Sequence, residues 1–403
     1  MMLVSIVFVC IINTVLSESQ PQLQPDPEVW IERGAPDCTT TEDDCGVFGL
    51  EYVRSGVGEG SACDTGTAVL CRSSAPHTSL VDTPAHTLAA LSYNAFERNW
   101  FMSHDGQRER SCRVPATLRR MLPDLDVIGF QEVFMGGCFR GKLTLRHLLA
   151  QHGFPYTTRT VGAIIPQAVT DDDNDMRVGF KVLNGGMFVA SRWPIVQEDS
   201  IIYENADPLS WDGFSKKGVS YAKINKTDAS GRWKLYNLFS THQQTGDNAD
   251  IKVGQAAEQR AFVDRLAIPP DQPVLFLGDY NIDLYDDDEL LSAVMATLEA
   301  TLPATVGERE CTSDGENDLH DDEKSCSWLD YVAFSHTHEK PTHATMEAVR
   351  PMQEEGFPIC FDEGKILRFG YLWPDDERCT NKNYAVRDLS DHFAVLGRYM
   401  FPE

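Results

Sequence analysis

The chain has no apolar stretch long enough to cross a membrane, and it has few basic residues. Its N-terminal apolar run is roughly a dozen residues long, whereas a transmembrane helix needs about 20. The 403 residues include 61 acidic and 35 basic side chains, which leaves a formal net charge of −26 at pH 7. Because a surface this negative repels phosphate backbones, the charge balance disfavours a non-specific polynucleotide-binding protein.

The sequence also lacks a Cys-x-x-Cys motif, so neither a zinc ribbon nor a thioredoxin-type redox site is indicated. Apart from Cys10, which lies in the N-terminal apolar run, the cysteines form neighbouring couples, as expected of disulfides in an oxidising compartment. They are Cys38, Cys45, Cys63, Cys71, Cys112, Cys138, Cys311, Cys326, Cys360 and Cys379. We expect Cys311–Cys326 and Cys360–Cys379 to be pairs.

Residues 1–19 have the features of a secretory signal peptide, because the apolar run is followed by the small residues Ser17 and Ser19. No Lys or Arg precedes the run, and a buried first strand is the alternative. The polar, Pro/Gln-rich segment that follows favours cleavage, so we expect a secreted protein. In a secreted protein Asn225, in the sequence Asn-Lys-Thr, is a candidate glycosylation site.

Residues 20–85 are rich in Gly, Ser and Thr, and their four cysteines predict a disulfide-laced N-terminal extension. Residues 86–403 alternate short apolar runs with amphipathic segments, which predicts an α/β (α+β) layered catalytic domain. Strands are predicted at 87–96, 124–134, 184–196, 218–224, 233–242, 273–281, 327–334 and 392–401. Helices are predicted at 111–122, 143–153, 254–267 and 287–300.

The sequence contains neither an internal repeat nor a low-complexity tract. The acidic stretches at 171–175 and 314–324 predict solvated loops. Neither has the alternating ligands and spaced final Glu of a calcium-binding loop.

Polar residues recur where the predicted strands meet loops. They are Asn94, Glu132, His242, Asp279, Asn281, Asp330, Asp391 and His392. A turn would explain any one of them, since Asp and Asn tolerate turn backbone angles. Because strand ends position side chains rigidly beside open space, the recurrence favours a single polar site.

The residue types in this set predict metal-assisted hydrolysis of a phosphoester. Carboxylate and amide oxygens suit Mg²⁺, or Mn²⁺ in its place. A His beside Asp residues suits a general base. A second His and an Asn can donate hydrogen bonds to phosphoryl oxygens, and the attacking group would be an activated water.

Six short segments occur in a fixed order over roughly residues 88 to 400: SYNAF, FQEVF, STH, GDYN, LDYV and SDH. In this order they resemble the endonuclease/exonuclease/phosphatase superfamily. The resemblance implies a four-layer α-β-β-α sandwich of two packed mixed sheets, with the site at one end of the sheets. It further implies that Glu132 is the principal Mg²⁺ ligand, with Asn94 beside it and Asp391 completing the metal or phosphate environment.

The same resemblance implies catalytic roles for the remaining residues. His392 would be the general base on water, oriented by Asp330. Asp279 and Asn281 would align the nucleophile and the phosphoryl group. His242 would stabilise the phosphate or protonate the leaving oxygen. For each residue taken separately, a strand-end cap or turn is the alternative.

Within the superfamily, the segments DVIGFQEVF, GGMFVASRWPIV and FSKKGVSYAKI (214–224) are similar to the secreted, phospholipase-C-like neutral sphingomyelinases. This implies hydrolysis of sphingomyelin to ceramide and phosphocholine at a bilayer surface. The sequence STHQQT departs from the pattern, which usually has a Leu after the His. The N-terminal extension and the acidic stretches are not part of the shared pattern.

A lipid substrate requires contact with the membrane surface. Phe369, Tyr371 and Trp373, within the Cys360–Cys379 interval, are candidates for an aromatic hairpin tip that inserts into lipid. The same residues would also suit a buried strand, because alternation cannot separate the two.

Other functions remain open on sequence grounds. A secreted deoxyribonuclease-like enzyme would use the same core but would want basic residues around the site, which the net charge of −26 disfavours. An inositol-polyphosphate phosphatase would place a basic residue after the Asn of GDYN and an Asp-Arg pair at LDYV. A non-catalytic binding module would usually lose a ligand or the base, and none is lost here.

Overall fold

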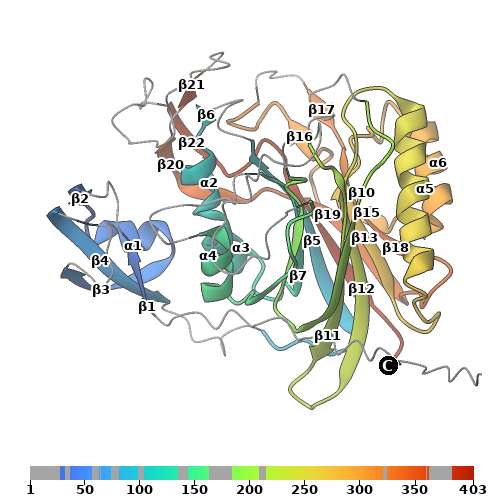
Figure 1. Ribbon diagram of the computed structural model, residues 1–403, viewed down its shortest axis with the longest axis horizontal. Coiled ribbons are helices and arrows are strands. Elements are labelled where there is room, and N and C mark those ends of the chain that lie inside the picture. Colours follow the sequence, from blue (N-terminus) through green and yellow to red (C-terminus); the bar gives the residue numbers. More distant parts are fainter. Residues whose placement is uncertain are drawn as a thin grey trace, which may run out of the picture.

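Two β-sheets packed face to face form the centre of the molecule, and helices cover both outer faces (Figure 1). The computed structural model describes residues 28–31, 37–56, 63, 65–73, 81–98, 104–134, 144–162, 184–207, 215–320, 325–359, 361–362 and 384–403. This arrangement confirms the predicted four-layer sandwich of two mixed sheets.

One central sheet has six strands. In spatial order they are β10 (Ile195–Ile202), β11 (Gly218–Thr227), β12 (Trp233–His242), β13 (Val274–Asp279), β18 (Asp330–Ser335) and β14 (Ala300–Thr301). β12 and β13 are parallel and their last residues, His242 and Asp279, are partners. β18 is antiparallel to β13, and its first residue, Asp330, is paired with Asp279. The sheet thus brings three polar side chains together at one edge.

The other central sheet has seven strands. In spatial order they are β15 (Ala304–Val306), β19 (His343–Val349), β23 (Ala394–Met400), β5 (Thr87–Glu97), β7 (Val127–Val133), β9 (Phe188–Ser191) and β8 (Tyr156–Thr157). β5 and β7 are parallel, with Asn94 paired to Gln131. Asn94 and Glu132 therefore lie at the same end of neighbouring strands.

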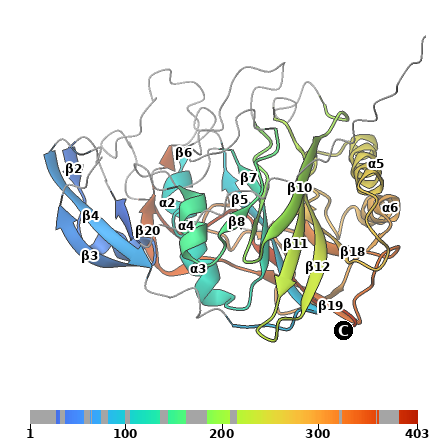
Figure 2. The same ribbon diagram turned by 60° about the horizontal axis from the view of Figure 1, so that its bottom comes forward.

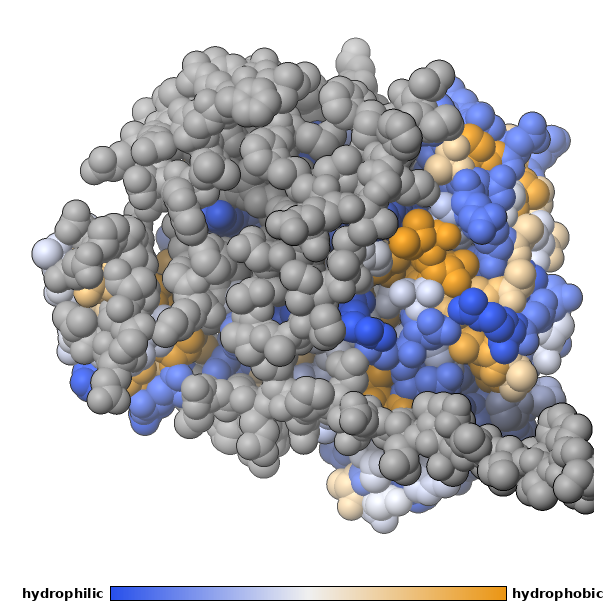
Figure 3. Space-filling view, viewed as in Figure 1, coloured by the Kyte–Doolittle hydropathy of each residue, from blue (hydrophilic) through white to orange (hydrophobic). Residues whose placement is uncertain are grey.

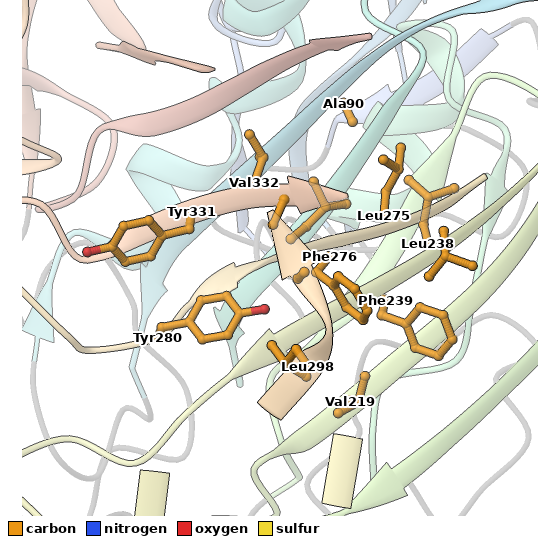
Figure 4. Close-up of a cluster of buried hydrophobic side chains, with 14 of the residues drawn as sticks. Ala90, Val219, Leu238, Phe239, Leu275, Phe276, Tyr280, Leu298, Tyr331 and Val332 are labelled. Atoms are coloured by element: carbon orange, nitrogen blue, oxygen red, sulfur yellow. The ribbon is translucent and has the colours of Figure 1, made fainter. Parts of the chain in front are cut away.

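The main hydrophobic core fills the space between the two sheets and continues under α5 and α6. It contains Ala90 of the seven-stranded sheet together with Leu238, Leu275 and Val332 of the six-stranded sheet, all essentially buried (Figure 4). The sheets approach each other closely at Gly129, where an added Cβ would lie 2.7 Å from Ser240 Oγ. Strands covered on both faces are apolar without alternation, which is why their positions could be predicted from the sequence.

Helices form the two outer layers (Figures 1 and 2). α5 (Ala249–Arg265) and α6 (Asp288–Leu298) cover the six-stranded sheet, and Phe262 of α5 meets Phe239 edge to face at 5.6 Å. The helices on the other side are α2 (Gln107–Ser111), α3 (Val114–Met121) and α4 (Leu145–Gln151). Leu118 and Leu149 belong to a second core cluster on the outer face of the seven-stranded sheet.

The described part of the N-terminal extension is a small sheet with one helix. Its elements are β1 (Glu28–Ile31), β2 (Asp37–Thr39), α1 (Asp43–Val47), β3 (Leu50–Gly56) and β4 (Thr65–Ser73). Disulfides Cys38–Cys63 and Cys45–Cys71 tie it together. It packs through Phe48 against Leu148 of α4, and Phe48 O is 2.9 Å from His152 Nε2. The boundaries at residues 19, 85 and 86 stay predictions.

The prediction for Cys311–Cys326 is confirmed. Cys360 and Cys379 lie outside the described residues. The described residues also form three two-stranded sheets: β16 (Ser313–Asp314) with β17 (Cys326–Ser327), β20 (Met352–Ile359) with β22 (Tyr384–Asp388), and β6 (His104–Asp105) with β21 (Phe361–Asp362).

The acidic stretch that begins at residue 314 differs from the solvated loop expected of it. Within its described part, Asn317 is 3% exposed and donates from Nδ2 to Ser390 O at 2.8 Å. The backbone N–H of Asp318 donates to Asp388 Oδ2 at 2.8 Å. Buried polar contacts of this kind fix the segment against the C-terminal part of the domain, which charge composition alone does not reveal.

The surface near α5 and α6 carries both hydrophilic and hydrophobic residues (Figure 3). Among described residues, the most exposed large apolar side chain is Trp233, at 64%. No helix in the described ranges is both long and apolar enough to cross a bilayer.

Candidate active site

Both central sheets and one loop contribute polar side chains to the candidate site. Asn94 comes from β5, Glu132 from β7, His242 from β12, Asp279 from β13, Asp330 from β18, and Asp391 and His392 from the loop before β23. Neighbouring-strand register and the contacts described below place these predicted residues in one cluster.

Asp330 and His392 form a hydrogen-bonded pair. His392 Nδ1 lies 2.8 Å from Asp330 Oδ2, and Asp330 is fully buried while 12% of the His392 side chain is exposed. Burial alone would lower the pKa of His392, but the charges of Asp330 and Asp391 outweigh it and raise that pKa well above its ordinary value. Burial raises the pKa of Asp330 to about 6, against the opposing charge of His392. The pair can therefore hold an imidazole in one tautomer and stabilise its charged form.

Asp279 is held in place by two asparagines. Asn94 Nδ2 donates to Asp279 Oδ2 at 3.0 Å, and the backbone N–H of Asn281 donates to Asp279 Oδ1 at 2.8 Å. Asn281 has φ of 52°, a left-handed conformation that Asn adopts more readily than most residues. Burial would raise the pKa of Asp279, but the charges of His242 and His392 outweigh it and hold that pKa below its ordinary value.

His242 lies between carboxylates and a lysine. Its Nε2 is 3.5 Å from Asp279 Oδ2, 3.8 Å from Glu132 Oε1 and 3.0 Å from Lys217 Nζ. Lys217 also donates to Gln243 O at 2.8 Å. Desolvation, followed by repulsion from Asp391, raises the pKa of Glu132 to about 7. The Lys217 ammonium and the His242 ring therefore lie beside Glu132, a carboxylate that is costly to ionise.

Lys217 and Lys252 were missed by the sequence reasoning. Lys252, on α5, is 2% exposed and donates to the carbonyl oxygen of Asn281. The sequence signal for Lys217 was present in the segment FSKKGVSYAKI, where it counted only as part of a resemblance. Lys252 lies in a helix whose other positions mix polar and apolar residues, so nothing in the pattern distinguished it.

The residues fit a divalent cation. Ligand atoms of Asp279, Asp330 and His392 lie within 4.8 Å of one another and could hold a metal ion. The Asp330–His392 hydrogen bond accounts for much of that closeness, whereas Asp330 Oδ1 is buried without a hydrogen-bond partner. Burial raises the pKa of Asp391 as it does that of Glu132. A divalent cation beside these buried carboxylates would favour their ionised forms. Their hard oxygen donors suit Mg²⁺ or Mn²⁺.

The remaining predicted residues are three aromatic residues and the glycosylation candidate. Phe369, Tyr371 and Trp373 are outside the described residues. Asn225 lies in β11, where its backbone N–H donates to Pro194 O at 3.0 Å, and its side-chain Oδ1 is buried without a partner. Glycosylation of Asn225 stays a prediction.

The chain is similar in sequence and in fold to known proteins. Sphingomyelinase C of Bacillus cereus is 24% identical over 356 residues, which cover 82% of this chain and 92% of that protein. The crystal structure of Sphingomyelinase C from Streptomyces griseocarneus superposes with a TM-score of 0.58 and 24% identity, over 78% of this chain and 99% of the other. A beta toxin double mutant from Staphylococcus aureus, crystallised with bound magnesium ions, gives a TM-score of 0.56 and 20% identity, over 79% and 100%.

The profile of the Endonuclease/Exonuclease/phosphatase family matches residues 91–392, a span that begins in β5 and ends at His392. It includes every polar residue of the candidate site. The family and the relatives indicate a hydrolase of the phosphodiesterase or phosphatase type. This chain belongs to the Endonuclease/Exonuclease/phosphatase family.

Proposed function

We propose that this protein is a secreted phosphodiesterase that hydrolyses sphingomyelin to ceramide and phosphocholine in the presence of Mg²⁺ or Mn²⁺. The observation that carries the proposal is the buried Asp330–His392 pair beside the carboxylates Glu132, Asp279 and Asp391. Relatives named Sphingomyelinase C, which align with most of the chain, support the choice of substrate. The disulfides are consistent with an oxidising, extracellular compartment.

His392 is the general base in this proposal. Its Nδ1 is committed to Asp330, so Nε2 takes a proton from the attacking water. The charge that forms on the imidazole is stabilised by Asp330, since the buried carboxylate lies 2.8 Å away. The oxygen of that water attacks phosphorus, and the bond to the ceramide oxygen breaks.

Lys217, His242 and Asn281 would stabilise the negative charge that develops on the phosphoryl oxygens. Lys217 Nζ and Asn281 Nδ2 both donate to Gln243 O, and Lys217 Nζ also lies 3.0 Å from His242 Nε2, so these three side chains lie close together. Preorganised donors stabilise charge that grows in the transition state. His242 would stabilise the phosphate or protonate the departing ceramide oxygen.

Glu132 would be the principal ligand of the cation, with Asn94 and Asp391 beside it. The amide oxygen of Asn94 accepts the backbone N–H of Phe96 at 3.0 Å and retains a second lone pair for a ligand role. A bound divalent ion supplies electrostatic stabilisation of phosphoryl oxygens and lowers the pKa of coordinated water.

One assay tests the proposal: purified protein with sphingomyelin vesicles, phosphatidylcholine vesicles or plasmid DNA, each with Mg²⁺ or with chelator. We expect turnover of sphingomyelin with Mg²⁺ and none with chelator. Cleavage of DNA without cleavage of lipid would transfer the assignment to a secreted nuclease. Failure to turn over any of the three would favour a non-catalytic binding module.

Contact with the bilayer is part of the proposal. Phe369, Tyr371 and Trp373 would insert at the surface, where amphipathic rings are favoured. Trp373→Ala should slow turnover of sphingomyelin vesicles while sparing a soluble phosphodiester analogue. Exposed Trp233, replaced by Ala, is the matched control and should leave both rates unchanged. Equal loss on both substrates in Trp373→Ala would mean that Trp373 is a structural residue.

A further inference from the structure

Thr312 contacts Asp330 of the Asp330–His392 pair and lies on the loop just before β16. No catalytic role for Thr312 is predicted from the sequence. It is fully buried, and its hydroxyl makes three contacts. Thr312 Oγ1 is 2.8 Å from Asp330 Oδ2, 2.9 Å from the backbone N of Leu329 and 3.3 Å from the backbone N of Asp330. The residue thus meets both the carboxylate and the chain that carries it.

The direction of these hydrogen bonds follows from the groups involved. The backbone N–H groups of Leu329 and Asp330 can only donate, so Thr312 Oγ1 accepts both. Its single O–H proton is then left for Asp330 Oδ2, the oxygen that also faces His392 Nδ1. Because Asp330 Oδ1 has no hydrogen-bond partner, these two donors on Oδ2 define the rotation of the carboxylate.

The backbone of Thr312 also reaches the loop that carries His392. Its carbonyl oxygen accepts the N–H of Phe393 at 2.6 Å, one residue beyond the imidazole. Two residues near Thr312 in the chain also contact the loop that carries His392. The Arg309 guanidinium lies over the Phe393 ring at 4.6 Å, and Asn317 donates to Ser390 O. Thr312 therefore contacts Asp330 directly and also the residue that follows His392.

A disulfide holds this loop closed. Cys311, adjacent to Thr312, is bonded to Cys326, which precedes Asp330 by one short segment. Beside the bond, Ser313 and Asp314 pair with Ser327 and Cys326 in the β16–β17 ladder. A two-stranded ladder this short is marginal in water without further support, so the disulfide is well placed to maintain it.

We propose that Thr312 is a positioning residue for the hydrolysis proposed above, on which this inference rests, and that the Cys311–Cys326 disulfide holds it in place. The Thr312 hydroxyl fixes Asp330 so that Oδ2 meets His392 Nδ1 and keeps His392 Nε2 directed toward the water. The loop makes the general base dependent on a covalent link that lies outside the cluster of metal and phosphate residues.

The first experiment compares Thr312→Val, which keeps the shape and removes the hydroxyl, with Thr312→Ser, which keeps the hydroxyl. With sphingomyelin vesicles and Mg²⁺, Thr312→Val should lower kcat by at least ~10-fold with KM within about threefold, a part of what a whole general base contributes. Thr312→Ser should recover most of the lost kcat. Wild-type kcat in Thr312→Val, or equal loss in both variants at unchanged melting temperature, would overturn the proposal.

The second experiment tests the disulfide. The double variant Cys311→Ala/Cys326→Ala should lower kcat to a similar extent as Thr312→Val. Cys38→Ala/Cys63→Ala, which removes a disulfide of the N-terminal extension, is the matched control and should keep wild-type kcat. Equal kcat in the two double variants would show that Cys311–Cys326 does not act through Thr312.

A third measurement needs no substrate and so separates this inference from the proposed function. The His392 Nδ1–H proton, bonded to a carboxylate, should give a downfield resonance in the proton NMR spectrum. We expect that resonance to shift upfield in Thr312→Val and to return in Thr312→Ser. If the wild-type protein turns over no sphingomyelin, the proposed function fails while this shift still tests the positioning. An unchanged resonance in Thr312→Val would refute it.

Discussion

His392 has one ring nitrogen committed to Asp330, which leaves the other for a water. The hydrogen bond of 2.8 Å fixes the tautomer, and the 12% exposure of the His392 side chain allows solvent to reach it. Glu132, at the end of β7, is separated from His392 by more than two hundred residues of chain. The chemistry thus depends on single side chains whose proximity only the folded structure provides.

Removing either side chain should abolish most of the activity. His392→Ala and Glu132→Gln should each lower kcat for sphingomyelin by at least ~100-fold, the low end for a general base or a metal contact. The measurement is steady-state turnover with saturating Mg²⁺. His343→Ala, at an exposed histidine of β19, is the control and should turn over at the wild-type rate. Activity near wild type in His392→Ala would exclude it as the base.

The raised pKa of Glu132 predicts how stability depends on pH when the metal is chelated. Burial moves that pKa from 4.5 to about 7, so the folded protein keeps a proton that the unfolded chain releases. Within this window the unfolded state binds fewer protons, and the free energy of unfolding therefore falls as pH rises, by about 1.4 kcal/mol per unit of pKa shift. Thermal unfolding in chelator measures this dependence. Between pH 5 and 7 the free energy of unfolding of Glu132→Gln should fall less than that of the wild-type protein, by about 1.4 kcal/mol per unit of pKa shift.

Glu97 supplies a matched control for that experiment. It is fully buried in β5, and burial raises its pKa to about 8. Glu97→Gln should also reduce the fall in stability, but Mg²⁺ should still raise its melting temperature more at pH 7 than at pH 5. In Glu132→Gln that dependence on Mg²⁺ should be lost. An identical response of the two variants to Mg²⁺ would contradict the assignment of Glu132 as a ligand.

At the scale of single residues, the sequence was sufficient to predict those site residues that have a distinctive chemical type at a strand end. Asp279 and His392 stand out because a carboxylate and an imidazole follow or precede apolar runs. Lys217 and Thr312 do not stand out, because a lysine and a threonine are ordinary in loops. Their importance comes from partners distant in the chain, such as His242 and Asp330, which no local pattern encodes.

The central strands of the main domain could be predicted because they are apolar runs buried on both faces, and the helices because apolar residues recur at three- and four-residue steps. β12 ends at His242 and β13 ends at Asp279, both within the predicted ranges, since each strand contains a short run of apolar residues. α5 begins at Ala249 rather than 254, where Asn248 accepts the N–H of Ile251 as a cap. Caps and sheet order depend on side-chain contacts that hydrophobic periodicity does not contain.

The contact between the two sheets makes a prediction at the level of elements. Gly129→Ala would place a Cβ 2.7 Å from Ser240 Oγ of the facing sheet, and should cost about 1–3 kcal/mol of unfolding free energy. Gly356→Ala, whose Cβ would meet Ala385 at 3.7 Å, is the control in another strand. Chemical denaturation of both variants checks the difference. Equal stability would mean that the sheets can separate slightly at no cost.

The charge of the whole molecule predicts a preference among membranes. A net charge of −26 repels anionic lipid, and salt screens that repulsion over about 10 Å at 0.1 M. Turnover of sphingomyelin vesicles should fall when phosphatidylserine is added at low salt and should recover with added NaCl. Vesicles of sphingomyelin and phosphatidylcholine should show little effect of salt. Faster turnover with phosphatidylserine would indicate a local basic contact that dominates the net charge.

The attachment of the N-terminal sheet has a practical consequence for anyone who shortens the polypeptide. Phe48 covers Leu148 of α4, and neither side chain meets solvent in the full protein. A recombinant version that begins near residue 84 would expose the apolar surface of α4 around Leu148. It would also remove Cys45 and Cys71, which belong to the same buried cluster as Cys112. Such a product should precipitate or self-associate on purification, even though all the residues of the candidate site would still be encoded.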